Sequence, residues 1–305
     1  MYAAPPIVST QVFAAVPQEF QIKGRSNEWL EARQHGTLTS FLEGPSFDTE
    51  GNLYCTDIPY GRIFKVSPKG SFELVTEYDG EPNGLKINKE GRIFIADQKR
   101  GLLTLDPGDS KPRPYIERLN MERLKGPNDL VFSRNGDLYF TDQAQTGLQD
   151  PTGRVWRVCA DGRVDLLLDN VPSPNGIVLN LNETILYVAV TRANAVWRVP
   201  LNSKNGLINK VGLFIQLSGG GGPDGLALDE QGNLAIAHAG LGAVWLFSPI
   251  GEPLCRINSC TGGRMITNLA YGGPENKTLY MTESSSGSIL VADMQAAGKK
   301  MYSHM

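Results

Sequence analysis

Short apolar runs alternate with polar turns along almost the whole chain, and one pattern occurs six times. Each copy starts with a polar residue and continues through an apolar strand, a turn, a second strand and a third strand. The second copy, for example, reads EPNGLKINKEGRIFIAD and then GLLTLD. The polar residues that start the copies, which we call anchors, are Glu43, Asn83, Asn128, Asn175, Asp224 and Asn268.

The spacing of the anchors predicts the fold class. They follow one another at intervals of 40 to 49 residues. A period in the forties that is built from short strands and Gly-rich turns is typical of propeller blades. Runs between the copies, such as SFELVTEY and VGLFIQLS, add a fourth, outer strand. We therefore predict an all-β fold, a six-bladed β-propeller of four-stranded antiparallel blades.

The N-terminal segment lacks the repeat, and the sixth copy lacks an obvious outer strand. We predict that residues 1–36 form an N-terminal extension, a strap or a closing strand, and that residues 37–305 form the propeller as a single domain. A strand from STQVFAAV or TLTSFL would close the sixth blade and so remove a free sheet edge. Residues 17–36 show no strand pattern, which favours a surface strap or lid.

Composition narrows the possible partners and location. The net charge is −3 and the pI is about 5.7, so neither nucleic acid nor an anionic membrane is indicated. No apolar run approaches the ~20 residues that span a bilayer, and the N-terminus has no signal-peptide pattern. The four cysteines show no C-x-x-C spacing, which favours buried thiols in a reducing, cytoplasmic compartment. The oligomeric state stays open.

The anchors are candidate ligands for a cation. In a propeller they converge at one mouth of the channel, where the second strands also end, at Asp57, Asp97, Asp142, Val190, His238 and Glu283. Carboxylate and amide oxygens suit a hard divalent cation. Two carboxylates on one narrow axis, Glu43 and Asp224, would repel each other without a cation between them. The alternative for Asn83 and Asn268 is that they simply form strand-entry turns.

The phrases EGPSF, GPNDLVF, SPNGIVL and GPDGLAL resemble the gluconolactonase family, which includes senescence marker protein (regucalcin) and luciferin-regenerating enzyme. The likeness runs from about residue 38 to residue 292. It implies that Glu43, Asn175 and Asp224 bind the metal, and that Asn128 contacts metal-bound water, metal or substrate. It also implies that Asp224 is the general base. Ca²⁺ is the expected ion, with Mg²⁺, Mn²⁺ or Zn²⁺ as alternatives.

The resemblance and the residues together predict a metal-dependent hydrolase that opens a small lactone. A divalent cation polarises a carbonyl and stabilises the negative oxygen of the transition state. Asp224 or Asp129 is then the candidate base for the attacking water, and His238 is the candidate acid for the leaving oxygen. Arg192 is a candidate contact for the small-molecule substrate, as is Asn128.

Two other functions stay open at this point. The same site could catalyse a non-hydrolytic reaction of a biosynthetic pathway, such as carbon–carbon cleavage, dehydration or cyclisation, because one fold hosts many reactions. The chain could instead be a binding module without activity. A zinc site of several histidines is disfavoured because the chain has three His in all, and no G-x-S-x-G elbow is present.

Overall fold

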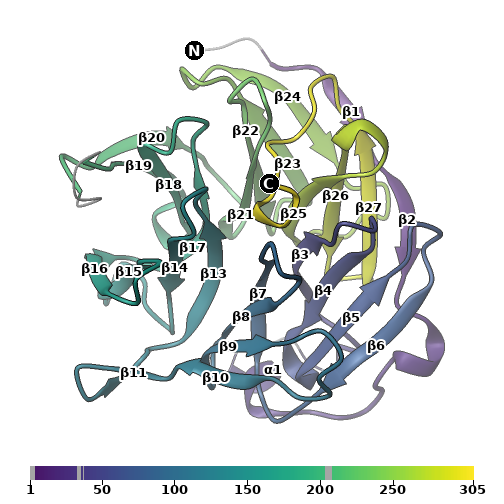
Figure 1. The fold of residues 1–305 in the computed structure, drawn as a ribbon. Coiled ribbons are helices and arrows are strands. Elements are labelled where there is room, and N and C mark those ends of the chain that lie inside the picture. Colours follow the sequence, from purple (N-terminus) through teal and green to yellow (C-terminus); the bar gives the residue numbers. More distant parts are fainter. Residues whose placement is uncertain (1–3, 33–35, 37, 203–207) are drawn as a thin grey trace.

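The strands form a closed ring of blades around a central channel. The computed structural model describes residues 4–32, 36, 38–202 and 208–305. Six of its sheets radiate from the channel like the blades of a propeller (Figure 1). The first strand of each blade contacts the first strands of the two neighbouring blades, so these strands line the channel. The predicted fold, a six-bladed β-propeller, is confirmed.

Each blade is an antiparallel meander that runs from the channel outward. Blades one to three consist of β3 (Leu42–Phe47), β4 (Leu53–Asp57), β5 (Arg62–Val66) and β6 (Phe72–Glu77); β7 (Pro82–Ile87), β8 (Ile93–Asp97), β9 (Gly101–Leu105) and β10 (Arg113–Ile116); and β13 (Pro127–Phe132), β14 (Leu138–Asp142), β15 (Gly153–Val158) and β16 (Val164–Val171). A small hairpin, β11 (Arg118–Leu119) and β12 (Glu122–Arg123), connects blades two and three.

Blades four to six repeat this order. They consist of β17 (Pro174–Leu179), β18 (Ile185–Val190), β19 (Ala195–Pro200) and β20 (Gly212–Gln216); β21 (Gly222–Leu228), β22 (Leu234–Ala239), β23 (Ala243–Phe247) and β24 (Pro253–Asn258); and β25 (Ile266–Gly272), β26 (Thr278–Glu283), β27 (Ser288–Asp293) and β2 (Gln11–Ala15). The short helices are α1 (Glu28–Ala32) and the 3₁₀ turns η1 (Gln18–Phe20), η2 (Ile58–Tyr60), η3 (Thr191–Ala193), η4 (Pro274–Asn276) and η5 (Tyr302–His304).

The N-terminal segment closes the ring. Strand β2 pairs antiparallel with β27 and completes blade six, as the sequence predicted. Strand β1 (Ile7–Ser9) pairs parallel with β24, and so adds a fifth strand to blade five that the sequence did not predict. The proposed boundary between residues 1–36 and 37–305 falls beside residues outside the described part of the chain and stays a prediction.

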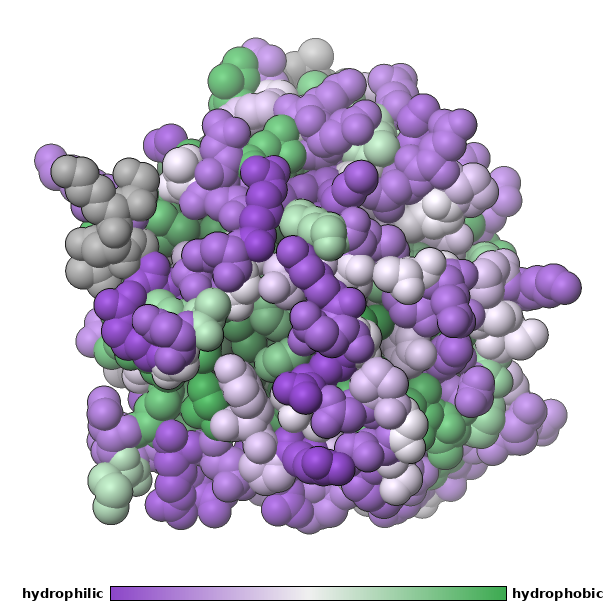
Figure 2. Space-filling model, viewed as in Figure 1, coloured by the Kyte–Doolittle hydropathy of each residue, from purple (hydrophilic) through white to green (hydrophobic). Residues whose placement is uncertain are grey.

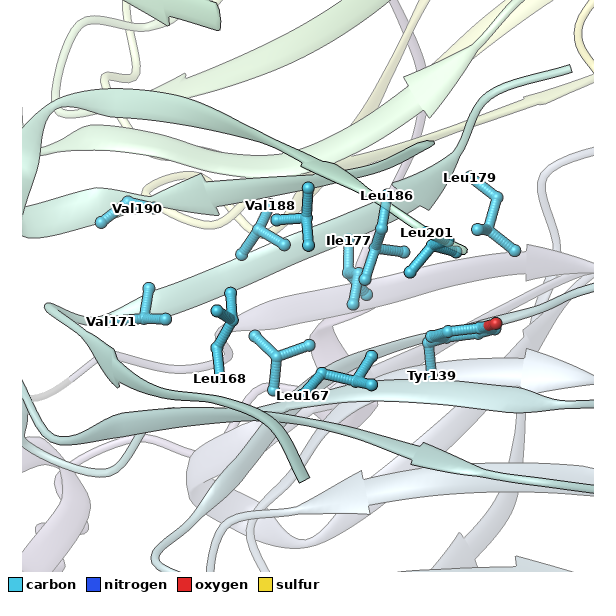
Figure 3. Close-up of a cluster of buried hydrophobic side chains, with 12 residues drawn as sticks. Tyr139, Leu167, Leu168, Val171, Ile177, Leu179, Leu186, Val188, Val190 and Leu201 are labelled. Atoms are coloured by element: carbon cyan, nitrogen blue, oxygen red, sulfur yellow. The ribbon is translucent and has the colours of Figure 1, made fainter. Parts of the chain in front are cut away.

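The apolar core lies between the blades. Six clusters of buried side chains each join two successive blades. Between blades three and four, Tyr139 and Leu168 face Ile177 and Val188 across the gap between the two sheets (Figure 3). Each blade therefore buries both faces of its sheet, and no blade has a core of its own.

The acidic residues that end the second strands stabilise the fold rather than face the channel. Asp57 is fully buried, accepts the backbone N–H of Phe41 at 2.7 Å and pairs with the guanidinium of Arg62. Asp142 accepts the N–H of Gly126 at 2.7 Å and pairs with Arg154 in the same way. These carboxylates hold the segment that leads into the first strand of their blade.

The C-terminal residues lie over the end of the channel that is opposite to the anchors. Lys299 N–H donates to the carbonyl of Leu228 at 2.8 Å, and the Tyr302 ring stacks on Phe132 with centroids 4.8 Å apart. The C-terminus lies near the centre of the ring in Figure 1, and Figure 2 shows that this face is largely hydrophilic. One end of the channel is therefore covered by the chain itself.

The structure modifies one expectation about the cysteines. Cys55 and Cys159 are buried as expected, but Cys255 is half-buried and Cys260 is exposed. In the described residues none of the four forms a disulfide.

Within the same residues no helix has the length and apolar character to cross a bilayer. The cytoplasmic location stays a prediction.

The buried ion pair of blade one gives a stability test. Substituting Asp57→Ala leaves Arg62 charged, buried and without its partner, which costs about 3–5 kcal/mol of unfolding free energy. The matched control is Asp79→Ala, because Asp79 pairs with Lys99 and Arg100 at the surface and contributes little. Urea unfolding of the three proteins measures both effects, and equal midpoints for both variants would contradict the assignment.

Candidate functional site

A cavity of about 660 Å³ opens at the anchor end of the channel. Its floor carries one side chain from each of the first five blades: Glu43, Asn83, Asn128, Asn175 and Asp224. All five side chains are at most 8% exposed, so their polar atoms exchange little with bulk water. The prediction that these anchors converge is thus fulfilled by five of the six.

Local backbone geometry explains the recurring Asn-Gly or Asp-Gly pair. The pairing of every first strand with its second strand shifts register directly at the anchor. Such a bulge turns side chains away from the regular alternation of a strand. The following glycine is required by close packing, since a Cβ on Gly176 would lie 2.2 Å from the carbonyl oxygen of Asp224. Glycine therefore lets adjacent first strands approach closely.

Blade six departs from the predicted anchor assignment by one residue. Its strands pair Ile266 with Glu283 and Leu269 with Met281, which places Thr267 at the anchor position. Asn268 consequently occupies the position that glycine occupies in most blades. From there its Nδ2 donates to Oε2 of Glu43 at 2.8 Å, across the junction of the last and first blades.

The two acidic anchors, Glu43 and Asp224, are buried, and both have a raised pKa. Burial raises the pKa of Glu43 to about 7, against the hydrogen bonds that its carboxylate accepts from Gly44 N–H and Asn268. Burial also raises the pKa of Asp224 well above its usual range, and the negative charges of Glu43 and Asp129 add to this effect. Hydrogen bonding from the Asn175 amide acts in the opposite direction.

Three anchor amides have an oxygen without a partner in the described part of the chain. The Oδ1 atoms of Asn83, Asn128 and Asn175 are buried and accept no hydrogen bond from the described residues. The orientation of Asn128 is fixed because its Nδ2 donates to Gln143 Oε1 at 2.8 Å, while Gln143 in turn donates to Ser173. Buried oxygens of this kind are normally satisfied, so a missing positive or donor group is indicated.

The donor set fits a hard divalent cation. It offers two carboxylates and three neutral amide oxygens, and Ca²⁺ takes six to eight such oxygen ligands. Among the described residues no three His, Cys, Asp or Glu side chains lie together as a metal-binding group. A cation at this cavity would therefore depend on the asparagine oxygens as much as on Glu43 and Asp224.

The other predicted site residues fall in different places. Arg192, in η3, lines the cavity and lies close enough to Asp224 to lower its pKa. Asp129 lies next to Asn128 in sequence, yet it is not among the residues that line the cavity. Its Oδ1 accepts the N–H of Leu130 at 2.8 Å and is 3.7 Å from Nζ of Lys86, in the next layer of the channel.

His238 is fully buried behind the cavity wall and does not line the cavity. Its Nε2 is 2.9 Å from the carbonyl oxygen of Gly219, and its Nδ1 accepts the indole N–H of Trp245 at 3.2 Å. Burial lowers its pKa, which keeps the ring neutral. These contacts support the glycine-rich segment before β21, and they occupy both ring nitrogens that proton transfer would need.

Several cavity residues were missed at the sequence level. Gln98 and Gln143 both follow the acidic residue that ends a second strand, in the phrases ADQ and TDQ, and this repeat was a usable signal. Trp29 lines the cavity from α1 and Ile58 from η2, while Phe41 and Met265 line it from the residues just before β3 and β25. Ile58 directly follows Asp57 and so shares the repeat position of Gln98 and Gln143. Trp29 lies outside the repeats, so their spacing did not indicate it.

The comparisons with known proteins agree with this architecture. Residues 41–285 match the model of the SMP-30/gluconolactonase/LRE-like region. The chain therefore belongs to the SMP-30/gluconolactonase/LRE-like family. It is 32% identical over 265 residues to lactonase drp35 of Staphylococcus aureus, covering 84% of this chain and 78% of that protein. It is 31% identical over 274 residues to a gluconolactonase of Zymomonas mobilis, covering 79% and 76%.

Solved structures show the same fold. The crystal structure of regucalcin from Agrobacterium tumefaciens, described as a calcium-binding protein, superposes with a TM-score of 0.78 at 22% identity. The match covers 98% of this chain and 99% of that one. At 22% identity this similarity establishes the fold of the chain but not its chemistry.

The contacts of His238 give a further test. We expect His238→Ala to lower the free energy of unfolding by about 1–3 kcal/mol, because it removes a fully buried side chain and leaves the partly buried indole N–H of Trp245 without its acceptor. The control His304→Ala changes an exposed residue near the C-terminus and should have little effect. Thermal unfolding monitored by circular dichroism measures both, and an unchanged melting temperature for His238→Ala would contradict the structural role.

Proposed function

We propose that this protein is a metal-dependent hydrolase that opens a small lactone at the anchor end of its channel. The observation that carries the proposal is the convergence of two buried carboxylates and three unpartnered amide oxygens in one cavity. The names of the two sequence relatives, a lactonase and a gluconolactonase, supply the substrate class. The substrate is a small molecule, in keeping with the volume of the cavity.

Glu43, Asn175 and Asp224 are the proposed ligands of one divalent cation, and Asn128 supplies a fourth oxygen to the cation or to the substrate. We favour Ca²⁺ because oxygen is the only donor atom among these side chains. When bound, the cation supplies Lewis acidity: it polarises the lactone carbonyl and stabilises the negative charge of the transition state. Its charge also compensates the repulsion between the two buried carboxylates.

Asp224 is the proposed general base. It lines the cavity, so its carboxylate can take a proton from the attacking water and return it to the ring oxygen as the lactone C–O bond breaks. Asp129 and His238 were the other predicted acid–base residues. We do not assign the proton transfer to them, because neither lines the cavity and each is engaged by neighbouring groups.

The substrate would be oriented by side chains on the far side of the cavity from blade one. Arg192 is exposed at the cavity rim, where its guanidinium can donate hydrogen bonds to a carboxylate or hydroxyl of the substrate. Asn128 also lines the cavity, and its hydrogen bond to Gln143 holds its amide in place. Both residues therefore position the ring of the lactone relative to Asp224.

Metal binding is tested by Glu43→Gln. The glutamine keeps the size and the acceptor for Gly44 N–H, but it removes one of the two charges, so we expect Ca²⁺ affinity to fall at least about tenfold. Isothermal titration of chelator-treated protein measures the affinity. The control Glu117→Gln removes an exposed charge outside the cavity. The ligand assignment is wrong if Glu43→Gln binds Ca²⁺ as tightly as the parent.

The base is tested by Asp224→Asn. An amide cannot accept the proton, so we expect the rate of acid release from lactones to fall by about 10²–10⁴-fold at saturating cation. A pH indicator follows the reaction on aldonolactones, aliphatic γ-lactones and aromatic lactones. Asp169→Asn, at an exposed position of β16, is the control.

The same panel decides between the proposal and its alternatives. Parent protein that binds a cation and turns over no lactone would contradict lactone hydrolysis and favour a non-hydrolytic reaction. Parent protein that binds neither cation nor lactone would favour a binding module.

A further inference from the structure

The cavity has two chemically different sides. Its apolar side consists of Trp29 from α1, Phe41 and Ile58 from blade one, and Met265 from the start of blade six. Blades three and four lie opposite blades six and one in the ring. The side chains that they contribute are mostly polar, with Ala144 and Leu148 as exceptions, and include Gln143, Gln145, Thr146, Gln149, Ser173 and Arg192. The anchors lie between the two sides.

The apolar side is a packed wall. Trp29, Phe41 and Ile58 belong to one buried cluster, against which Met265 packs. The rings of Trp29 and Phe41 are 4.9 Å apart at an interplanar angle of 61°. The indole N–H of Trp29 donates to Gln98 Oε1 at 3.0 Å, which satisfies the polar atom of the ring. Trp29 therefore needs no hydrogen bond from a bound molecule.

The N-terminal segment that carries Trp29 is fixed to blade one. Asn27 Nδ2 donates to the carbonyl of Pro59, and its Oδ1 accepts the N–H of Leu30 in the first turn of α1. The buried guanidinium of Arg62 donates to the carbonyl of Phe20 at 2.7 Å. The wall is thus part of the folded domain, with a defined position relative to Glu43.

We propose that the substrate carries an apolar group, an alkyl chain or an aromatic ring, beside its ester, and that Trp29 and Met265 select for it. This inference rests on the proposed lactone hydrolysis. A polyhydroxylated lactone would place hydroxyls against a carbon wall, where their hydrogen bonds to water are lost and not replaced. An apolar group buried there would leave the ester carbonyl at the anchors and the polar edge facing Gln143 and Arg192.

The experiment compares kcat/KM for glucono-1,5-lactone, γ-butyrolactone and a γ-lactone with a pentyl chain, at saturating Ca²⁺. We expect the parent to prefer the pentyl lactone. For each protein we compare the kcat/KM of the pentyl lactone divided by that of γ-butyrolactone. Both Trp29→Ala and Met265→Gln should lower this ratio about tenfold, which is the scale on which hydrophobic pockets discriminate between substrates. Leu213→Ala, an exposed change on β20 outside the cavity, should leave the ratio at its parent value.

Other results overturn the inference. It is wrong if the parent prefers glucono-1,5-lactone, or if both variants slow all lactones by the same factor. Met265→Gln preserves side-chain size, so it tests the inference even where circular dichroism shows that Trp29→Ala does not fold.

If no lactone is hydrolysed, the proposed function fails. Titration of the parent protein with lactams that bear the same substituents then tests whether the apolar wall binds an apolar group. Equal affinity for the pentyl and the polyhydroxylated lactams contradicts the proposed selection by the wall.

Discussion

Strand β2 pairs with β27, and this pairing joins the N-terminal part of the chain to the last blade. Because it closes the ring, blade one lies beside blade six, and Glu43 reaches Asn268 although 225 residues separate them in sequence. Thr267 makes a second link across the same junction, since its hydroxyl donates to the carbonyl of Leu42 at 2.9 Å. The floor of the cavity exists only because the ring is closed.

Closure of the ring also brings the acidic side chains of Glu43 and Asp224 to the same cavity. Between pH 4.5 and about 7 the folded protein binds a proton at Glu43 that the unfolded chain does not bind, so a rise in pH across this range lowers stability. Asp224 adds to this cost in the same direction. A site that destabilises the fold in this way is typical of function, and a bound cation would offset the cost.

The repeats made most of the fold predictable. Each blade carries the same apolar periodicity, and the spacing of the anchors was enough to predict that there are six blades. Blade six shows where this reasoning fails: the phrase TN takes the place of NG, and the strand register that selects Thr267 as anchor depends on a bulge. Likewise, the buried position of His238 reflects its packing against Trp245 and Gly219, which no repeat specifies.

The part of the apolar wall that carries Trp29 was beyond sequence reasoning, because it lies outside the repeats and only tertiary contacts fix it. The wall is nevertheless coupled to the anchors through one short segment. Phe41 forms part of the wall, and Glu43, two residues later, is an anchor. Asp57 holds the N–H of Phe41, while its partner Arg62 holds Phe20 of the N-terminal segment. One buried ion pair thus holds Phe41 of the wall beside the first acidic anchor, so part of the proposed specificity surface and part of the candidate metal site share a support in blade one.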